Sequence, residues 1–452
     1  MSLSKFSEIE TPRQFLPIVQ MAVERAKRRG AQFADAVISL GRDISVMVDK
    51  SSIKSSQSGW ERSFSIRVFV DGGMGFASTN GLETHVVETL VDRAIAQARI
   101  ATPDPNFVAL PSPEVAPYVP TVFDPQVLTL GPEDAIRWAS ENIREAKGVY
   151  PEVIVSGDVG VRVSSRVMAS STGIMLDRKS TSVYSGFFCI VKEDDAVGSF
   201  ADHAGARFLC DFVPTGLGRK ATTRAMAYRH ARKIQTGKTT LVLGPMAAHG
   251  LFAGLVHAAN AESIQRNRSI FTGKMGESIA PELLTITDNG IIDQGLNSAA
   301  YDGEGAVKKI VTVIDRGRFV NPLHNSYSAF KAGVANTGHG TRTRGISHSN
   351  LEIELGDKTE AQLIAEVKDG IYLEIGSLDP DLTSGDISTH LDFAFKIENG
   401  ELAYPVTNTM VGGNLHEVLM NIDAISSDYR YEPGNKMPSV RIRDVQVSSA
   451  GE

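Results

Sequence analysis

Cysteine is scarce in this chain. Only Cys189 and Cys210 occur among its 452 residues, which excludes a disulfide framework and is typical of a protein from a reducing compartment. Both cysteines lie in apolar, strand-like runs, a context that predicts buried and unreactive thiols. We therefore expect a cytoplasmic protein in which neither cysteine is a catalytic nucleophile.

Long hydrophobic runs are also missing. Residues 1–13 are polar and hold no apolar core of a signal peptide. The most apolar segment, residues 241–261, is interrupted by Pro245, His249 and His257. It is too short and too polar to span a bilayer, so we expect no membrane segment.

No long run of charge of one sign occurs. The chain has 46 basic and 53 acidic residues and a net charge of -7. Its densest basic stretch, residues 219–238, is expected to be the solvated face of a helix. An acidic protein repels phosphate backbones, which disfavours direct binding to nucleic acid.

Several signatures of catalysis are absent as well. The chain contains neither a G-x-S-x-G nucleophile elbow nor an H-E-x-x-H zinc helix. The run at 237–240 resembles the end of a P-loop, but Arg232 stands where that motif requires glycine. His249 and His257 share one predicted helix and lie about 12 Å apart along it, too far for two ligands of one zinc ion.

What is present is an α+β pattern. Hydrophobic residues make up 42% and charged residues 22% of the chain, with 41 glycines and 19 prolines, which is typical of a globular protein rich in strands and turns. Helices and antiparallel strands are predicted up to residue 236, and strands and turns predominate after it. The expected domains are an N-terminal α+β domain with a proline-rich linker at 1–125, a central α+β domain at 126–236 and a C-terminal β-rich domain at 237–452.

Few polar side chains are marked as a site by their own pattern. The loop T-G-H-G-T-R at 337–342 could present His339 and Arg342 to a ligand, or it could be a mobile connector. Further scattered polar candidates are Asp302, Glu304, His416 and Glu417. Local pattern alone does not bring these residues together.

Several segments, taken in order and spacing, resemble the TldD/PmbA (TldD/TldE) family. In the N-terminal half, D-G-G-M-G-F-A-S at 71–78 is similar to the family's glycine-rich hairpin. The C-terminal half carries the others: S-I-F-T-G-K-M-G-E at 269–277, Y-D-G-E-G at 301–305, S-Y-S-A-F-K-A-G at 326–333, T-G-H at 337–339 and P-S-V-R-I-R at 438–443. The resemblance implies an N-terminal α/β portion and a C-terminal β-rich portion.

The resemblance also implies a role, because this family contains two kinds of subunit. TldD-type chains are zinc metalloproteases with H-E-x-x-x-H on a helix and a C-terminal cysteine ligand, and TldE (PmbA) chains lack these ligands and pair with TldD. At the corresponding positions this chain has Phe252, Ala253 and His257, and no cysteine follows Cys210. Phenylalanine cannot bind zinc and alanine cannot activate a metal-bound water. The chain therefore resembles the TldE type, with His257 as the only residue that matches a zinc ligand.

We accordingly expect a non-catalytic subunit with no cofactor of its own. Its partner would be a TldD-like protease that carries the zinc, and the heterodimer would cleave or trim unfolded or modified peptides held as added β-strands. In isolation the chain could form a homodimer. The side chains expected to face the substrate cavity are His257, His339, Arg342, Asp302 and Glu304.

Two other functions stay open from the sequence. The chain could be a self-sufficient, divergent metallopeptidase. Its ligands would then be drawn from His257, His324, His339, His348 and His416. Alternatively it could be an interaction protein that modulates DNA gyrase, a label that PmbA-like chains have carried.

Overall fold

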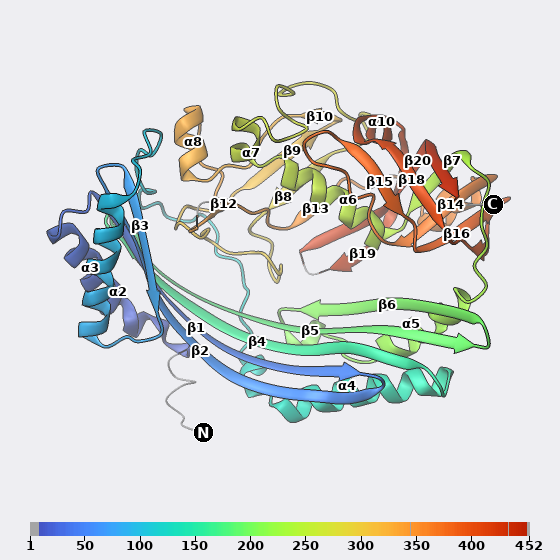
Figure 1. The fold of residues 1–452 in the computed structure, drawn as a ribbon, viewed down its shortest axis with the longest axis horizontal. Coiled ribbons are helices and arrows are strands. Elements are labelled where there is room, and N and C mark those ends of the chain that lie inside the picture. Colours follow the sequence, from blue (N-terminus) through green and yellow to red (C-terminus); the bar gives the residue numbers. More distant parts are fainter. Residues whose placement is uncertain (1–8, 344, 433, 450–452) are drawn as a thin grey trace.

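The computed structural model describes residues 9–343, 345–432 and 434–449 (Figure 1). Two parts are evident. A long, curved sheet with helices on its outer face is formed by the residues up to about 230, and a β-rich part formed by the residues after 236 lies over its concave face (Figure 1). None of the described helices is long and apolar enough to cross a membrane.

The curved sheet has six antiparallel strands in the order β3-β2-β1-β4-β5-β6. Its strands are β1 (Phe33–Asp49), β2 (Ser52–Val70), β3 (Gly73–Thr79), β4 (Ile154–Ser170), β5 (Met175–Glu193) and β6 (Ala196–Ala206). The predicted hairpin at 71–73 joins β2 to β3. At the centre of the sheet β1 pairs with β2 on one side and with β4 on the other.

That central pairing crosses the domain boundary expected at 125/126. β1 belongs to the first expected domain and β4 to the second, yet they are adjacent strands, and one hydrophobic cluster joins buried residues from Ile9 to Tyr228, together with a few of the C-terminal part such as Val242 and Phe395. The described residues of these two expected domains therefore share one sheet, and the proline-rich segment is a connection within it. The strand β7 (Gly237–Leu243) begins the C-terminal part.

Four helices cover the outer face of the curved sheet (Figure 1). They are α2 (Leu16–Arg28), α3 (Thr84–Ile100), α4 (Pro132–Val149) and α5 (Leu217–Ala227). The glycine-rich hairpin permits α3 to lie directly on β3, because a Cβ at Gly75 would come within 1.9 Å of the Ala94 carbonyl oxygen. Short 3-10 turns are η1 (Pro12–Phe15), η2 (Pro125–Thr129) and η3 (Leu209–Asp211).

The C-terminal part is built on a twelve-stranded sheet that begins with β7. Its other strands are β8 (Ile286–Asn289), β9 (Ile310–Asp315), β10 (Arg318–Phe319), β13 (Leu351–Ile353), β14 (Asp369–Ile375), β15 (Asp386–His390), β16 (Phe393–Glu398), β17 (Glu401–Pro405), β18 (Thr409–Asn414), β19 (Ile422–Glu432) and β20 (Asn435–Ser449). A separate two-stranded ladder consists of β11 (Gly340–Thr341) and β12 (Gly345–Ile346). The long strand β20 pairs with four neighbours, so it is the centre of this sheet.

The helices of the C-terminal part are short, except for the first. They are α6 (Pro245–Ala258), α7 (Ala261–Gln265), α8 (Ser326–Ala332), α9 (Glu360–Ala365) and α10 (Leu415–Met420). Helix α6 is apolar on most of its surface because it packs inside a second hydrophobic core. The expected α+β fold with antiparallel sheets and a β-rich C-terminal region is confirmed.

The two cysteines differ in burial. Cys189 is buried on β5, and this burial raises the pKa of its thiol, as expected for an inert side chain. Cys210 is exposed, so the expectation that it is buried was wrong. The run that contains it forms the 3-10 turn η3 at the surface instead of a strand.

Candidate functional site

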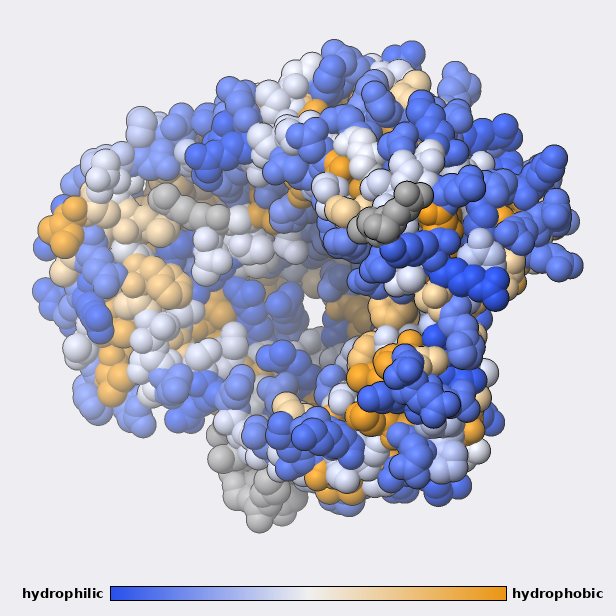
Figure 2. All heavy atoms as spheres, turned by 45° about the vertical axis from the view of Figure 1, so that its right-hand side comes forward, coloured by the Kyte–Doolittle hydropathy of each residue, from blue (hydrophilic) through white to orange (hydrophobic). Residues whose placement is uncertain are grey.

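A cavity of about 820 Å³ lies between the concave face of the curved sheet and the C-terminal part. Figure 2 shows the hollow that remains between these two parts. The walls are β4, β5, the end of the proline-rich segment at 119–123 and loops of the C-terminal part around 296–303 and 339–348. Its size lies in the range of ligand-binding pockets.

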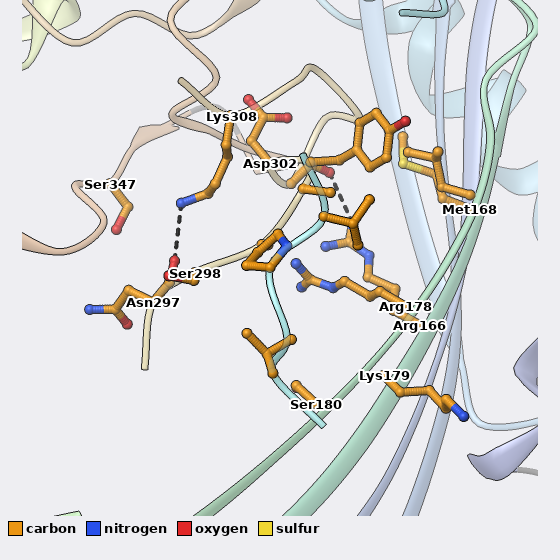
Figure 3. Close-up of a pocket in the computed structure, with 18 of the residues that line it drawn as sticks. Arg166, Met168, Arg178, Lys179, Ser180, Asn297, Ser298, Asp302, Lys308 and Ser347 are labelled. Atoms are coloured by element: carbon orange, nitrogen blue, oxygen red, sulfur yellow. Dashed lines mark hydrogen bonds between the residues drawn. The ribbon is translucent and has the colours of Figure 1, made fainter. Parts of the chain in front are cut away.

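Two arginines project into this cavity from neighbouring strands (Figure 3). Arg166 on β4 and Arg178 on β5 are direct partners in the antiparallel register. Their side chains leave the sheet on the same face, where like charges directly opposite each other are destabilising. The burial of Arg166, with the charge of Arg178 adding to it, lowers the Arg166 pKa to about 9.

The two guanidinium groups have few partners. Arg166 donates from Nη2 to the Gly303 carbonyl oxygen at 2.9 Å, and its Nε is buried without a hydrogen bond. No hydrogen bond or ion pair joins Arg178 to any of the described residues, and its side chain is exposed to the cavity. The wall between β4 and β5 therefore carries positive charge that no adjacent carboxylate neutralises directly.

The other cations of the cavity wall are engaged. Arg207 donates to the backbone oxygens of Thr181 at 2.8 Å, of Gly295 at 3.3 Å and of Leu296. Lys308 donates to Ser349 Oγ at 2.5 Å and to the Asn297 carbonyl oxygen at 3.3 Å. These contacts fix the loops that form the wall.

Asp302 is the buried acidic residue of the same wall. Its Oδ1 accepts hydrogen bonds from the amides of Glu304 (2.8 Å) and Ala306 (3.0 Å), and its Oδ2 accepts one from Gly340 (2.7 Å). Burial, with the nearby charge of Glu304, raises the Asp302 pKa to about 7 despite these bonds. Asp302 is thus partly protonated near neutral pH and only weakly offsets the two arginines.

Beside the cavity, a buried ion network joins the two parts of the molecule. Asp35 on β1 accepts from Arg67 Nη2 at 2.6 Å and Nε at 2.9 Å, and from Arg342 Nε. Arg67 also donates to Glu304 Oε1 at 3.3 Å and to the Arg342 carbonyl oxygen at 2.8 Å. The two guanidiniums hold the Asp35 pKa below its usual range against the effect of burial. The expected candidates Arg342 and Glu304 are therefore parts of a structural junction.

His339 is held in the interior as well. Its Nε2 lies 2.9 Å from Asp288 Oδ1 and its Nδ1 lies 3.0 Å from Thr337 Oγ1, with the side chain fully buried. The loop packs closely against the chain at Val307, where only glycine fits, because a Cβ at Gly338 would come within 2.2 Å of the Val307 carbonyl oxygen. Both polar atoms of His339 are thus already used, although the residue contributes to the cavity wall.

Helix α6 carries the positions that the family resemblance singles out. Phe252 is fully buried in the core of the C-terminal part, Ala253 is half-buried, and His257 is exposed. Among the described ranges, no three His, Cys, Asp or Glu side chains lie close enough to hold a metal ion. The residues present on α6 do not fit a zinc site of the H-E-x-x-x-H type.

The structure thus divides the five expected cavity residues. Asp302, His339 and Arg342 contribute to the cavity wall, and Glu304 and His257 do not. His416 lies elsewhere, beside a second cavity of about 430 Å³.

Sequence reasoning missed the arginine pair, although a signal was present. Arg166 and Arg178 lie six residues on either side of Thr172, in the turn between two predicted strands. A hairpin closed at that turn places them opposite each other.

Comparison with known proteins identifies the fold and the family. Two family models match this chain: the PmbA/TldA metallopeptidase domain 1 at residues 34–98 and the PmbA/TldA metallopeptidase C-terminal domain at residues 236–449. The chain belongs to the TldD/PmbA family. The resemblance seen in the sequence is thereby confirmed.

Similar proteins extend over nearly the whole length of this TldD/PmbA chain. It is 25% identical to the metalloprotease PmbA of Escherichia coli O157:H7, over 99% of each chain. The crystal structure of a candidate modulator of DNA gyrase from Bacteroides thetaiotaomicron has a TM-score of 0.87 at 26% identity and covers 96% of this chain and 98% of its own. The fold is shared with TldE of Thermococcus kodakarensis, with a TM-score of 0.87 at 21% identity over 96% of this chain and all of that one.

Proposed function

We propose that this chain is the non-catalytic, TldE-like subunit of a cytoplasmic peptidase complex. Its partner is a TldD-like chain that carries the zinc ion and performs the cleavage. This chain completes the substrate chamber and binds unfolded or modified peptides. The observation that carries the proposal is the side-chain set of helix α6, where Phe252 and Ala253 stand at the positions of a zinc ligand and a general base.

The burial of Phe252 supports this proposal. Its ring is fully buried in the core, so the position serves packing, and a phenyl ring has no atom that can bind zinc. His257 is exposed on the same helix, and among the described residues no group of three His, Cys, Asp or Glu side chains could hold a metal ion. The lack of a preformed ligand set argues against the alternative of a self-sufficient metallopeptidase.

The other histidines weigh against that alternative in the same way. His324 lies 3.1 Å from Ser328 Oγ and His339 lies 2.9 Å from Asp288 Oδ1, so both rings are engaged in local contacts. His416 belongs to the second cavity. A zinc ion would require at least three of these side chains within a few Å of one point.

The cavity supports a role in peptide binding. It lies between two β-rich parts and is lined by both backbone and polar side chains, and extended peptides bind such surfaces by adding a strand. A structural relative is described as a candidate modulator of DNA gyrase, so modulation of gyrase is the second candidate function. The acidic net charge disfavours direct contact with DNA in that function.

The proposal is tested by reconstitution. The full chain is purified alone and together with a TldD-like chain from the same genome, and zinc content, peptidase activity on an unfolded peptide and particle mass are measured. We expect no zinc and no activity in the isolated chain, and a zinc-containing, active complex of both chains. Replacing the glutamate of the partner's H-E-x-x-x-H motif should abolish activity.

The matched control in this chain is His257→Ala. Because His257 is not part of a group of three possible metal ligands among the described residues, this variant should leave the metal content unchanged. Stoichiometric zinc in the isolated chain that is lost in His257→Ala would contradict the proposal and favour the self-sufficient enzyme. Retention of gyrase instead of a TldD-like chain in a pull-down would favour the modulator function.

A further inference from the structure

We infer that Arg166 and Arg178 form a carboxylate-binding site, which holds the C-terminal carboxylate or an acidic side chain of the peptide in the chamber. The identification of the ligand as a peptide rests on the proposed function. The existence of an anion site rests only on the side chains of β4 and β5. Neither the family models nor the names of the similar proteins assign a role to these two residues.

The first argument is the register of the two strands. Arg166 and Arg178 are direct cross-strand partners on the face of the sheet that points into the cavity. Their neighbours in the same row make ordinary pairs: Ser164 and Ser180 share a hydrogen bond of 2.9 Å, and Met168 lies opposite Leu176. Two facing cations are the exception in this row, and they lower the stability of the empty protein.

The second argument is the shortage of internal partners. Arg166 uses one of its donors on the Gly303 carbonyl and leaves its Nε buried without an acceptor. Arg178 makes no hydrogen bond or ion pair within the described ranges. Buried donors without acceptors are unfavourable, and the guanidinium fork matches the two oxygens of a carboxylate. An anion between the two side chains would satisfy both groups at once.

The third argument is the surroundings of the pair. Figure 3 shows both guanidinium groups side by side beneath the loop that carries Asp302, and Ser180 of β5 lines the same cavity. Arg207 and Lys308 add positive charge at the same cavity while they hold its loops. Because Asp302 gains negative charge as it deprotonates, a singly charged carboxylate suits this site better than a doubly charged phosphate.

The test measures binding of matched peptides to the isolated full chain. Three unfolded peptides of one core sequence without acidic residues are compared by fluorescence anisotropy: one with a free C-terminal carboxylate, one with a C-terminal amide, and one amide with a single internal Glu. We expect the amide without Glu to bind about tenfold more weakly than a carboxylate form, which corresponds to the loss of one charge-assisted hydrogen bond. Whichever of the two carboxylate-containing peptides binds more tightly shows whether the site holds a C-terminal carboxylate or an acidic side chain.

Arg178→Gln and Arg166→Gln should each abolish this preference. The matched control is Arg162→Gln, on the same strand and the same face but about 13 Å away, where the side chain is exposed and paired with Asp43 at 3.3 Å. This control should keep the preference. Equal binding of all three peptides, or a preference that survives Arg178→Gln, would overturn the inference.

A second measurement keeps the site testable if the isolated chain binds peptides too weakly. The melting temperature is compared in sodium acetate and in sodium chloride of equal ionic strength. Acetate should raise it in the wild type and in Arg162→Gln but not in Arg178→Gln, and equal melting temperatures in the wild type would overturn the site. A chain that shows the carboxylate preference but forms no active complex with a TldD-like partner would contradict the proposed function and leave the carboxylate site intact.

Discussion

Two pairs of arginines lie near each other between the curved sheet and the C-terminal part, and they differ in what neutralises them. Arg67 and Arg342 share Asp35, and Arg67 also reaches Glu304. Arg166 and Arg178 face each other across β4 and β5 with no carboxylate between them. Arginine side chains thus form a closed junction in one place and an open cationic site in the other.

This difference distinguishes charged side chains that stabilise the fold from charged side chains that are available to a ligand. A buried cation with a buried anion and several hydrogen bonds contributes to the native state, and removal of one partner leaves the other uncompensated. A cation pair without an anion costs stability until a ligand arrives. Arg342 and Glu304, two of the five candidates expected from the sequence, belong to the first class, and the arginine pair that was missed belongs to the second.

The largest effect should come from breaking the closed junction. Asp35→Asn leaves Arg67 and Arg342 buried beside a neutral side chain, and we expect a loss of about 3–5 kcal/mol in the free energy of unfolding. Urea unfolding checks this value. Asp43→Asn on the same strand is the control, because Asp43 forms a partly exposed pair with Arg162 and should cost at most about 1 kcal/mol. Equal losses in the two variants would show that the junction is not a structural one.

The loss of stability expected for His339→Ala is smaller than that for Asp35→Asn, and His257→Ala is its control. His339→Ala leaves the buried Asp288 carboxylate without one of its partners, and we expect a loss of about 2–3 kcal/mol. His257 is exposed, so His257→Ala should change stability by less than about 0.5 kcal/mol. Thermal unfolding of the two variants decides the comparison. A stable His339→Ala variant would restore His339 as a candidate for ligand binding.

The third prediction concerns pH. The raised pKa of Asp302, about 7 in the folded chain against 3.8 as its ordinary value, means that the folded state keeps a proton that the unfolded state has lost between these pH values. The stability that Asp302 contributes therefore falls as pH rises from about 4 to 7. Relative to Asp302→Asn, the wild type should lose about 1–3 kcal/mol between pH 5 and pH 8.

Unfolding of both proteins across this pH range measures the difference. The loss of the Gly340 hydrogen bond in Asp302→Asn shifts its stability by a constant and does not alter the trend. Asp177→Asn, at an exposed position on the same cavity rim, should leave the pH profile unchanged. A parallel profile for the wild type and Asp302→Asn would refute the prediction.

The smallest expected effect is a gain in stability instead of a loss. In buffer without carboxylates, Arg178→Gln should stabilise the protein by about 0.2–1 kcal/mol, because it removes the repulsion between facing cations. Arg162→Gln should show no gain, since Arg162 is paired with Asp43. Calorimetric melting in chloride buffer is sensitive enough for this comparison. A destabilised Arg178→Gln variant would place Arg178 with the structural arginines.

Local elements were predictable because their signals are local. The glycine-rich hairpin at 71–78 and the helix shared by His249 and His257 form where the local sequence indicates them. The adjacency of β1 and β4 could not be predicted in this way. More than a hundred residues separate these strands, and the pairing depends on side chains that meet only after the sheet has formed.

The candidate site shows the same limit. Asp302, His339 and Arg342 line the cavity, but their hydrogen-bond partners come from other segments of the chain, and these partners hold all three side chains in place. The pairing of Arg166 with Arg178 was accessible from the turn at Thr172. The absence of a carboxylate beside these two arginines could not be predicted from the sequence, because it depends on every residue that surrounds the cavity.

The sequence by itself determined the α+β class and the family, because both are written in residue types and their order. Only the tertiary structure decided which charges are paired. An arginine has the same sequence signature whether it meets a carboxylate or an empty cavity, and the electrostatic energy depends on distance and burial, which the fold alone sets.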